Sequence, residues 1–281
     1  TDPHEAVTML LPQQGGWGGL VSTLPMMLLL TLVMTALGAM IVGRDVPQGG
    51  VFVAGVGLTA LALSGGSMQT MLAYYVESVA ATPDELLAAQ VADRQALMAG
   101  FAMDTVAWAA VMGVAWVLAI MLHRWLWSQE DESAPPVKPR SGKDVVVKPG
   151  WQALVITAVV AALVIWITIA RTPVANTLRG QVIASVAAGL FLGALAGRHF
   201  TNVDDTRWYV AAPLLVALVA YLLGYMSASM QWLDRADQYY AMLPITSPHG
   251  LVRPLPIEYI GVGVCGALAG CWTGRHPEIE E

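Results

Sequence analysis

Four polar side chains lie inside or at the ends of long apolar stretches: Asp104, Arg179, Glu258 and Gln69. An unpaired charge in hydrocarbon costs several kcal/mol, so such residues mark pairing partners, proton sites or solute paths. Their positions along the apolar stretches place them near one membrane boundary. They predict a small outward-facing polar site, in which Asp104 pairs with Arg179 and takes a proton or cation while Arg179 takes an anion. The simpler alternative, interfacial residues that only snorkel or hydrogen-bond to a neighbouring helix, is favoured over a ligand site.

Two Arg-His pairs, Arg198-His199 and Arg275-His276, each close an apolar stretch. Cations at the headgroup level can recognise lipid phosphates, which makes these four residues a candidate lipid-headgroup site. Arginine at the cytoplasmic end of a span is also common as a simple anchor. Anchoring is therefore the preferred interpretation.

Patterns for other chemistry are missing. There is no CxxCH motif and no pair of mid-span histidines for a haem, while Cys265 and Cys271 fall on different faces of one stretch. Neither a nucleophile elbow nor a phosphate loop is complete. The net charge of −6 and the lack of a basic, aromatic-rich block give no reason to expect nucleic acid. The sequence thus predicts no cofactor and no metal, and it lowers the expectation of an enzyme.

Glycine spacing is the strongest pattern in the chain. The motif GxxxGxxxGRH occurs twice, with its glycines at Gly189, Gly193, Gly197 and at Gly266, Gly270, Gly274. Glycines four residues apart share one helix face and let a second backbone approach closely. A weaker version, Thr35, Ala39 and Gly43, precedes Arg44. These faces predict helix packing, either within the chain or against another chain, and internal duplication is one origin for the repeat.

The elements that must position these residues are membrane helices. With 56% hydrophobic residues, 12% charged residues and a mean hydropathy of +0.60, the chain is too apolar for a soluble domain of 281 residues. About 20 apolar residues cross a bilayer as a helix. Seven stretches meet this need, and they predict an all-α, polytopic bundle with spans near 20–43, 50–75, 98–122, 151–170, 178–197, 208–229 and 257–274. The glycine-rich last stretch is the weakest, so six spans is the alternative.

The distribution of Lys and Arg residues predicts the orientation of the chain in the membrane. Seven spans would put nine of the fourteen Lys and Arg residues on one side, at Arg44, Arg124, Lys138, Arg140, Lys143, Lys148, Arg198, Arg207 and Arg275. Because cytoplasmic loops are enriched in these residues, we expect the N-terminus outside and the C-terminus in the cytoplasm. The preference for Arg over Lys indicates a bacterial plasma (inner) membrane.

The chain divides at a hydrophilic linker. Residues 1–127 hold a tail and three spans, residues 128–150 form a cytoplasmic linker with Pro135-Pro136, and residues 151–281 hold four spans. Two outer segments predict amphipathic helices: one starts at the capping pattern Thr82-Pro83-Asp84-Glu85 and leads into the third span, and one follows the sixth span. The second belongs to a structured outer loop at 230–256.

Many packing faces and little intramembrane chemistry favour a non-catalytic subunit that scaffolds or stabilises a larger membrane complex through its small-residue helix faces and outer loops. Its expected partners are membrane lipid and other membrane protein subunits. The alternative is a transporter or channel for a small solute with the outward-facing polar site described above. A third and weaker hypothesis, a lipid-modifying enzyme at the Arg-His level, lacks a nucleophile with an evident base.

Overall fold

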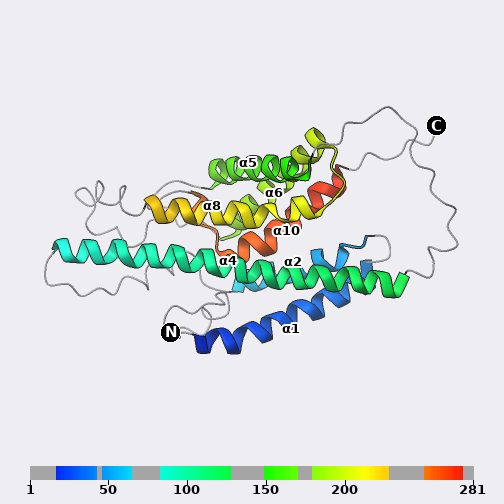
Figure 1. The fold of residues 1–281 in the computed structure, drawn as a ribbon, viewed down its shortest axis with the longest axis horizontal. Helices are drawn as coiled ribbons and strands as arrows, with labels where there is room; N and C mark the ends of the chain where they lie inside the picture. The colour runs from blue at the N-terminus through cyan, green and yellow to red at the C-terminus, as the bar shows by residue number, and fades with distance from the viewer. Residues whose placement is uncertain are drawn as a thin grey trace.

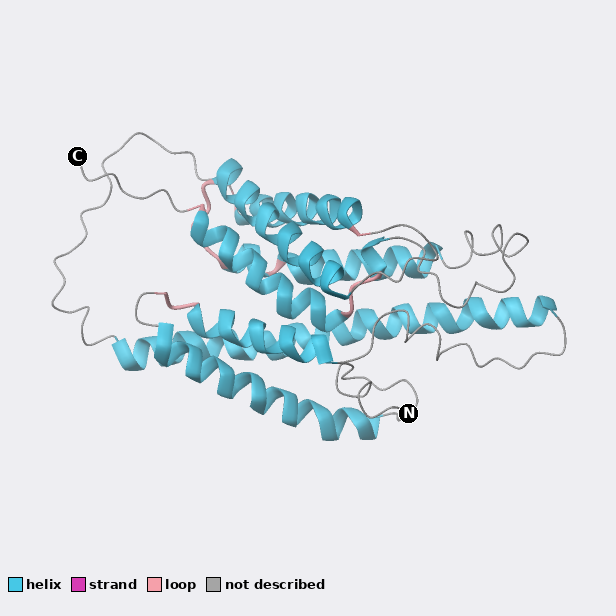
Figure 2. Ribbon diagram, turned by 180° about the vertical axis from the view of Figure 1, so that it is seen from behind, coloured by secondary structure: helices cyan, strands magenta, loops and turns pink. Residues whose placement is uncertain are grey.

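The computed structural model describes residues 17–42, 46–64, 83–127, 149–169, 179–227 and 250–274. Within these ranges every regular element is a helix (Figures 1 and 2). The helices are α1 (Trp17–Val42), α2 (Gly49–Ser64), α4 (Pro83–Trp127), α5 (Gly150–Thr168), α6 (Arg179–Thr201), α7 (Arg207–Val210), α8 (Ala212–Ser227), the 3-10 turn η3 (Gly250–Val252) and α10 (Pro256–Thr273). The chain is therefore an all-helical bundle, as its apolar stretches predict.

Each of the seven predicted stretches contains a helix, but only part of the predicted span count is established. In the described part of the chain, five helical segments are long and apolar enough to cross a membrane: Leu24–Val42, Val91–Trp127, Gly150–Thr168, Arg179–Thr201 and Arg207–Ser227. The α2 helix has 16 residues, about 24 Å at 1.5 Å per residue, and the rest of its predicted stretch lies outside the described residues. The α10 helix is not among the five either.

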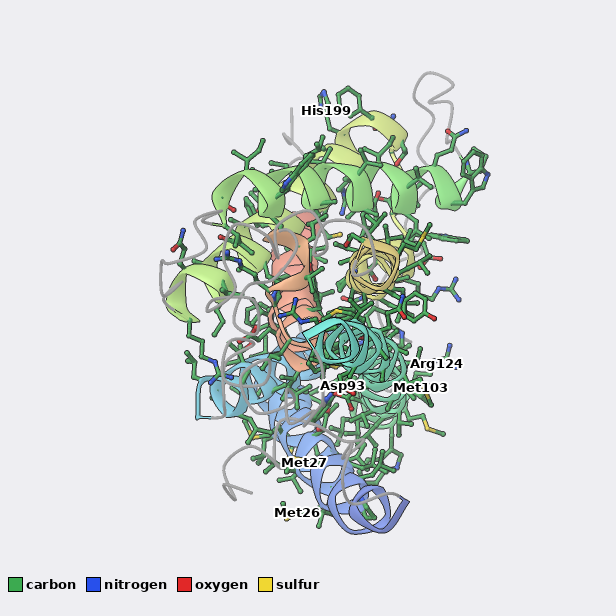
Figure 3. The ribbon with its side chains drawn as sticks, turned by 90° about the vertical axis from the view of Figure 1, so that its left-hand side faces the viewer. Met26, Met27, Asp93, Met103, Arg124 and His199 are labelled. Atoms are coloured by element: carbon green, nitrogen blue, oxygen red, sulfur yellow. The ribbon has the colours of Figure 1, made fainter. Side chains whose placement is uncertain are left out.

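The α10 helix occupies the centre of the bundle. A view along the bundle shows α6, α8, α4 and α2 around it, with α5 and α1 further out (Figure 3). Fourteen of its eighteen residues are buried. In the five apolar segments, by contrast, only 28% to 44% of the most apolar window is buried. The last described helix is thus a core element, whereas the helices around it turn a large apolar surface outward.

The α4 helix is much longer than the bundle needs. Its 45 residues extend about 68 Å at the standard rise per residue. It begins at Pro83, which confirms the helix start predicted from the capping pattern. Figure 1 shows its N-terminal turns continuing along the same axis past the ends of the neighbouring helices.

Exposed aromatic side chains lie near the ends of the bundle. Trp125, Trp151 and Trp208 are exposed at one end, close to the C-terminus of α4 and the N-termini of α5 and α7. Trp166 and Tyr225 are exposed at the opposite end, close to the C-termini of α5 and α8. Tryptophan and tyrosine concentrate at the two membrane interfaces, so this distribution fits a bundle that sits across a bilayer.

Candidate functional site

A polar cluster is built where the chain enters α10. Residues 250–255 pass into the bundle without forming an α-helix, and Gly250, Val252, Pro254 and Leu255 are buried there. Buried backbone that is not helical must find hydrogen-bond partners for its polar groups. Side chains from the surrounding helices supply some of them.

Two tyrosines and one glutamate hold this segment. The Tyr221 hydroxyl on α8 donates to the Pro254 carbonyl at 2.6 Å, and the Tyr259 hydroxyl on α10 donates to the Leu251 carbonyl at 2.6 Å. Glu258, the third residue of α10, accepts the Leu255 backbone N–H at 2.7 Å. This last bond is the glutamate half of a capping box, which satisfies a donor at the start of the helix. The three bonds fix where α10 begins.

Glu258 also forms an ion pair with Arg179, the first residue of α6. The Arg179 Nε lies 3.2 Å from Glu258 Oε1, and the two side chains are 16% and 3% exposed. The observed partner of Arg179 is thus Glu258, whereas the sequence suggests Asp104. The reason is the register of α6 and α10, which run in parallel: Arg179 and Glu258 are 79 residues apart, and so are the contacting residues Ala187 and Gly266.

Asp104 lies in the same interior but on another helix. It is 1% exposed and sits on the buried face of α4, between Phe101 and Trp108. It lies three residues after Phe101, whose ring contacts that of Tyr221, the residue that binds the Pro254 carbonyl just before α10. The Phe101 and Tyr221 rings are 5.5 Å apart between centroids, which joins α4 to α8 at this level.

The structure brings together some of the residues that the sequence suggests for a polar site. Arg179 and Glu258 are in contact and Asp104 is nearby, while Gln69 lies outside the described residues. Sequence reasoning missed the two tyrosines, although Tyr259 adjoins Glu258 and Tyr221 interrupts an apolar span. Both Glu258 oxygens are engaged in holding α10. In the described ranges, no group of three His, Cys, Asp or Glu side chains is placed to hold a metal.

The glycines of α6 face α5. A β-carbon on Gly189 would lie 2.7 Å from Ile165 Cγ1 and 3.0 Å from the Ala161 carbonyl oxygen. On Gly193 or Gly197 a β-carbon would meet the carbonyl or hydroxyl oxygen of Thr157. These distances are shorter than real β-carbons tolerate, so the close approach of the two backbones depends on glycine.

The glycines of α10 face α6 instead. A β-carbon on Gly266 would lie 2.5 Å from the Ala187 carbonyl oxygen, and one on Gly270 would meet the Phe191 carbonyl oxygen. One on Gly274 would lie 3.0 Å from Arg198 Cδ. The two copies of the motif therefore have different partners, and α6 lies between α5 and α10. Both glycine faces are covered within the chain.

The weaker motif packs in a similar way. Thr35 and Ala39 of α1 are buried, and a β-carbon on Gly50 of α2 would lie 2.6 Å from the Thr35 carbonyl oxygen. Gly43, the third position of the motif, lies outside the described residues.

Arg198 joins the C-terminal ends of α6 and α10. Its Nη1 donates to the Cys271 carbonyl at 2.8 Å, and its Nη2 lies 2.7 Å from Asp204 Oδ1. An arginine suits this position because it satisfies a carbonyl in the last turn of α10 and complements the negative end of the helix dipole. Asn202 lets the chain turn back toward Arg198, since its φ of 54° is left-handed and asparagine tolerates that region.

The four lipid-headgroup candidates divide accordingly. Arg198 is engaged within the chain, whereas His199 is exposed at the edge of the bundle (Figure 3) and packs edge-on against Phe200 at 5.3 Å. Arg275 and His276 lie outside the described residues. In its observed contacts, Arg198 bonds to protein groups and helps position α10.

In comparisons with known proteins, no protein-family model, no curated protein and no solved structure matches this chain. The contacts of its own residues are therefore what indicates a function.

Proposed function

We propose that this chain is a non-catalytic integral membrane subunit that scaffolds or stabilises a larger membrane protein complex. The observation that carries the proposal is that its intramembrane polar groups and glycine faces serve to hold the bundle together. Glu258, Arg179 and Arg198 all bind helix ends or each other. Such a bundle is suited to holding other proteins in place.

The surface for partners differs from the one expected from the glycine motifs. Because the α6 and α10 faces are covered by α5 and α6, other subunits would meet the outward sides of the outer helices and the projecting turns of α4. Ala92 and Ala96 are exposed in the N-terminal part of α4, residues 83–96, although Arg94 between them is buried. This part of α4, called the α4 arm below, offers a rigid surface for a neighbouring protein.

We further propose seven crossings, with the N-terminus outside and the C-terminus in the cytoplasm of a bacterial plasma membrane. Helices at all seven predicted positions and the aromatic residues at both ends of the bundle support the crossings. The distribution of Lys and Arg supports the orientation. The buried α10 would be the seventh crossing, surrounded by protein.

Photo-crosslinking in the native membrane tests the subunit proposal. A photoreactive amino acid replaces Ala92 or Ala96 on the α4 arm, and a matched probe replaces the buried Ala115 on the same helix. The proposal predicts a discrete, heavier adduct with a different membrane protein from the arm positions and none from position 115. Adducts with lipid alone, or no adduct from either arm position, would contradict it.

One observation favours the transporter alternative. The α10 helix starts inside the bundle after a buried non-helical segment, and in many transporters interrupted helices of this kind border the solute site. Asp104 lies one turn of α4 from Phe101, which contacts Tyr221 beside that start. In a reconstituted flux assay, Asp104→Asn would change the pH dependence of transport if this alternative holds. Flux that is absent, or unchanged by the substitution across pH, would remove the role assigned to Asp104.

A further inference from the structure

The α10 helix is surrounded almost entirely by protein. It runs through the middle of the bundle, and fourteen of its eighteen residues are buried. It contains Glu258 and a run of glycines, which contribute no side chain to lipid contact. What holds α10 in place must therefore be protein.

The contacts along α10 agree with this reasoning. On one side, a β-carbon on Gly261 would lie 2.9 Å from Leu58 Cβ of α2. On another, a β-carbon on Gly263 would lie 2.5 Å from Leu190 Cδ1 of α6 and 3.0 Å from Pro213 Cβ of α8. Three neighbouring helices thus fit directly against its backbone. Such a fit exists only when those helices are already in position.

Residues of earlier helices also hold both ends of α10. At the start, Arg179 of α6 pairs with Glu258 and Tyr221 of α8 binds the Pro254 carbonyl. At the end, Arg198 of α6 binds the Cys271 carbonyl. We refer to Arg179 and Tyr221 as the outer latch and to Arg198 as the inner latch.

We propose that α10 takes its place in a separate, late step: the preceding helices form a slot, and α10 enters it and is fastened by the two latches. Its position is set by fit to protein and not by partition into lipid. It follows that α10 can leave the slot while the outer helices remain in the membrane, as a local opening of lower free energy than global unfolding.

The chain carries its own reporter for this step. Its two cysteines, Cys265 and Cys271, both lie on α10. Cys271 is fully buried and Cys265 is half-buried against the Phe52 carbonyl of α2. Thiol labelling of the full chain therefore reports directly on whether α10 is seated.

A glycine substitution distinguishes fit to the neighbouring helices from partition into lipid as the cause of the position of α10. Gly266→Leu makes α10 more apolar, but its β-carbon would meet the Ala187 backbone. Gly113→Leu on α4 is the matched control, because a β-carbon there meets nothing within 4 Å. In native membranes, labelling of the full chain by N-ethylmaleimide should be about ten-fold faster in Gly266→Leu and unchanged in Gly113→Leu, as expected for local opening. Labelling of Gly266→Leu that stays equal to wild type or slows would show that lipid partition seats α10, and would overturn the proposal.

The outer latch gives a second, milder test in case Gly266→Leu does not accumulate. Arg179→Gln and Tyr221→Phe each remove one tie to the start of α10 and add no bulk. Both should speed labelling several-fold at a temperature where the chain still elutes as one species in size-exclusion chromatography. If labelling rises only at the temperature where that species is lost, α10 does not open separately and the proposal fails.

Discussion

At the scale of single residues, Glu258 shows how one buried charge is made tolerable. One oxygen accepts the Leu255 N–H at the start of α10, and the other lies 3.2 Å from Arg179 Nε. Removing one partner of a buried ion pair leaves the other charge uncompensated, which costs more than the pair contributes when intact. The glutamate and the arginine should therefore be strongly coupled.

Glu258→Ala is expected to lower the free energy of unfolding by about 3 kcal/mol or more, since it removes both the cap and the pair. Glu258→Gln should cost less, because its amide oxygen can still accept the Leu255 N–H. Thermal denaturation in mild detergent shows whether Glu258→Ala is less stable than Glu258→Gln. A double-mutant cycle with Arg179→Gln should give a coupling energy of roughly 0.5–3 kcal/mol, and strictly additive effects would argue against the pair.

Glycine substitutions on α6 give a matched comparison. Gly193→Ala places a β-carbon against the Thr157 carbonyl and should destabilise the chain by about 1–3 kcal/mol, the usual cost of overpacking. Gly180→Ala meets nothing within 4 Å at the start of the same helix, so it should be neutral or stabilise by up to about 1 kcal/mol. Equal thermal stability of the two variants would mean that the close contact of α6 with α5 is absent.

Sequence reasoning at this scale found the residues but not all their partners. Arg179 and Glu258 were identified because charges in apolar stretches stand out, yet Asp104 was paired with Arg179. The pairing depends on the parallel register of α6 and α10, which is a tertiary property. The same limit applies to the glycines, whose spacing indicates a packing face without saying which helix covers it.

At the scale of elements, the C-terminal ends of α6 and α10 form one unit through Arg198. The nearby Arg207 binds only Asp205 in its described contacts, and this hydrogen bonding holds the pKa of the Asp205 carboxyl below its usual value. Both groups of that pair are close to solvent, where ion pairs add little stability. The two arginines thus look alike in sequence, but Arg198 binds the end of another helix whereas Arg207 binds a neighbouring exposed residue.

Arg198→Gln should therefore lower the thermal transition of the chain clearly, because it leaves the Cys271 carbonyl in the last turn of α10 without its hydrogen-bond donor. Arg207→Gln is the matched control and should leave the transition unchanged, at low and at high salt. A comparison of the two melting curves shows whether Arg198 stabilises the chain more than Arg207 does. If Arg207→Gln proves as damaging as Arg198→Gln, the structural role of Arg198 at the end of α10 is not supported.

The positions of the helices follow well from sequence, because apolar stretches report directly on membrane helices. Their roles follow less well. The glycines of α10 make its stretch the weakest candidate span in the sequence. Only packing explains why such a glycine-rich segment lies at the centre of the bundle. The full length of α4 was also hard to foresee, although its start at Pro83 followed from local capping residues.

At the scale of the whole molecule, the described helices form a bundle that covers its own glycine faces and holds its central helix by polar contacts at both ends. Its outer helices turn apolar side chains outward, and α4 extends past one end (Figure 1). A bundle whose interior is used for its own stability is suited to supporting neighbours. This is the physical basis of the proposed subunit role.

Native mass spectrometry of the chain, released from its own membrane in mild detergent or in nanodiscs, tests that role most directly. The proposed function predicts that the chain is released with one or more different membrane proteins in a fixed ratio, and that Gly180→Ala preserves this assembly. A monodisperse chain that is released alone, or only with lipid, would contradict it.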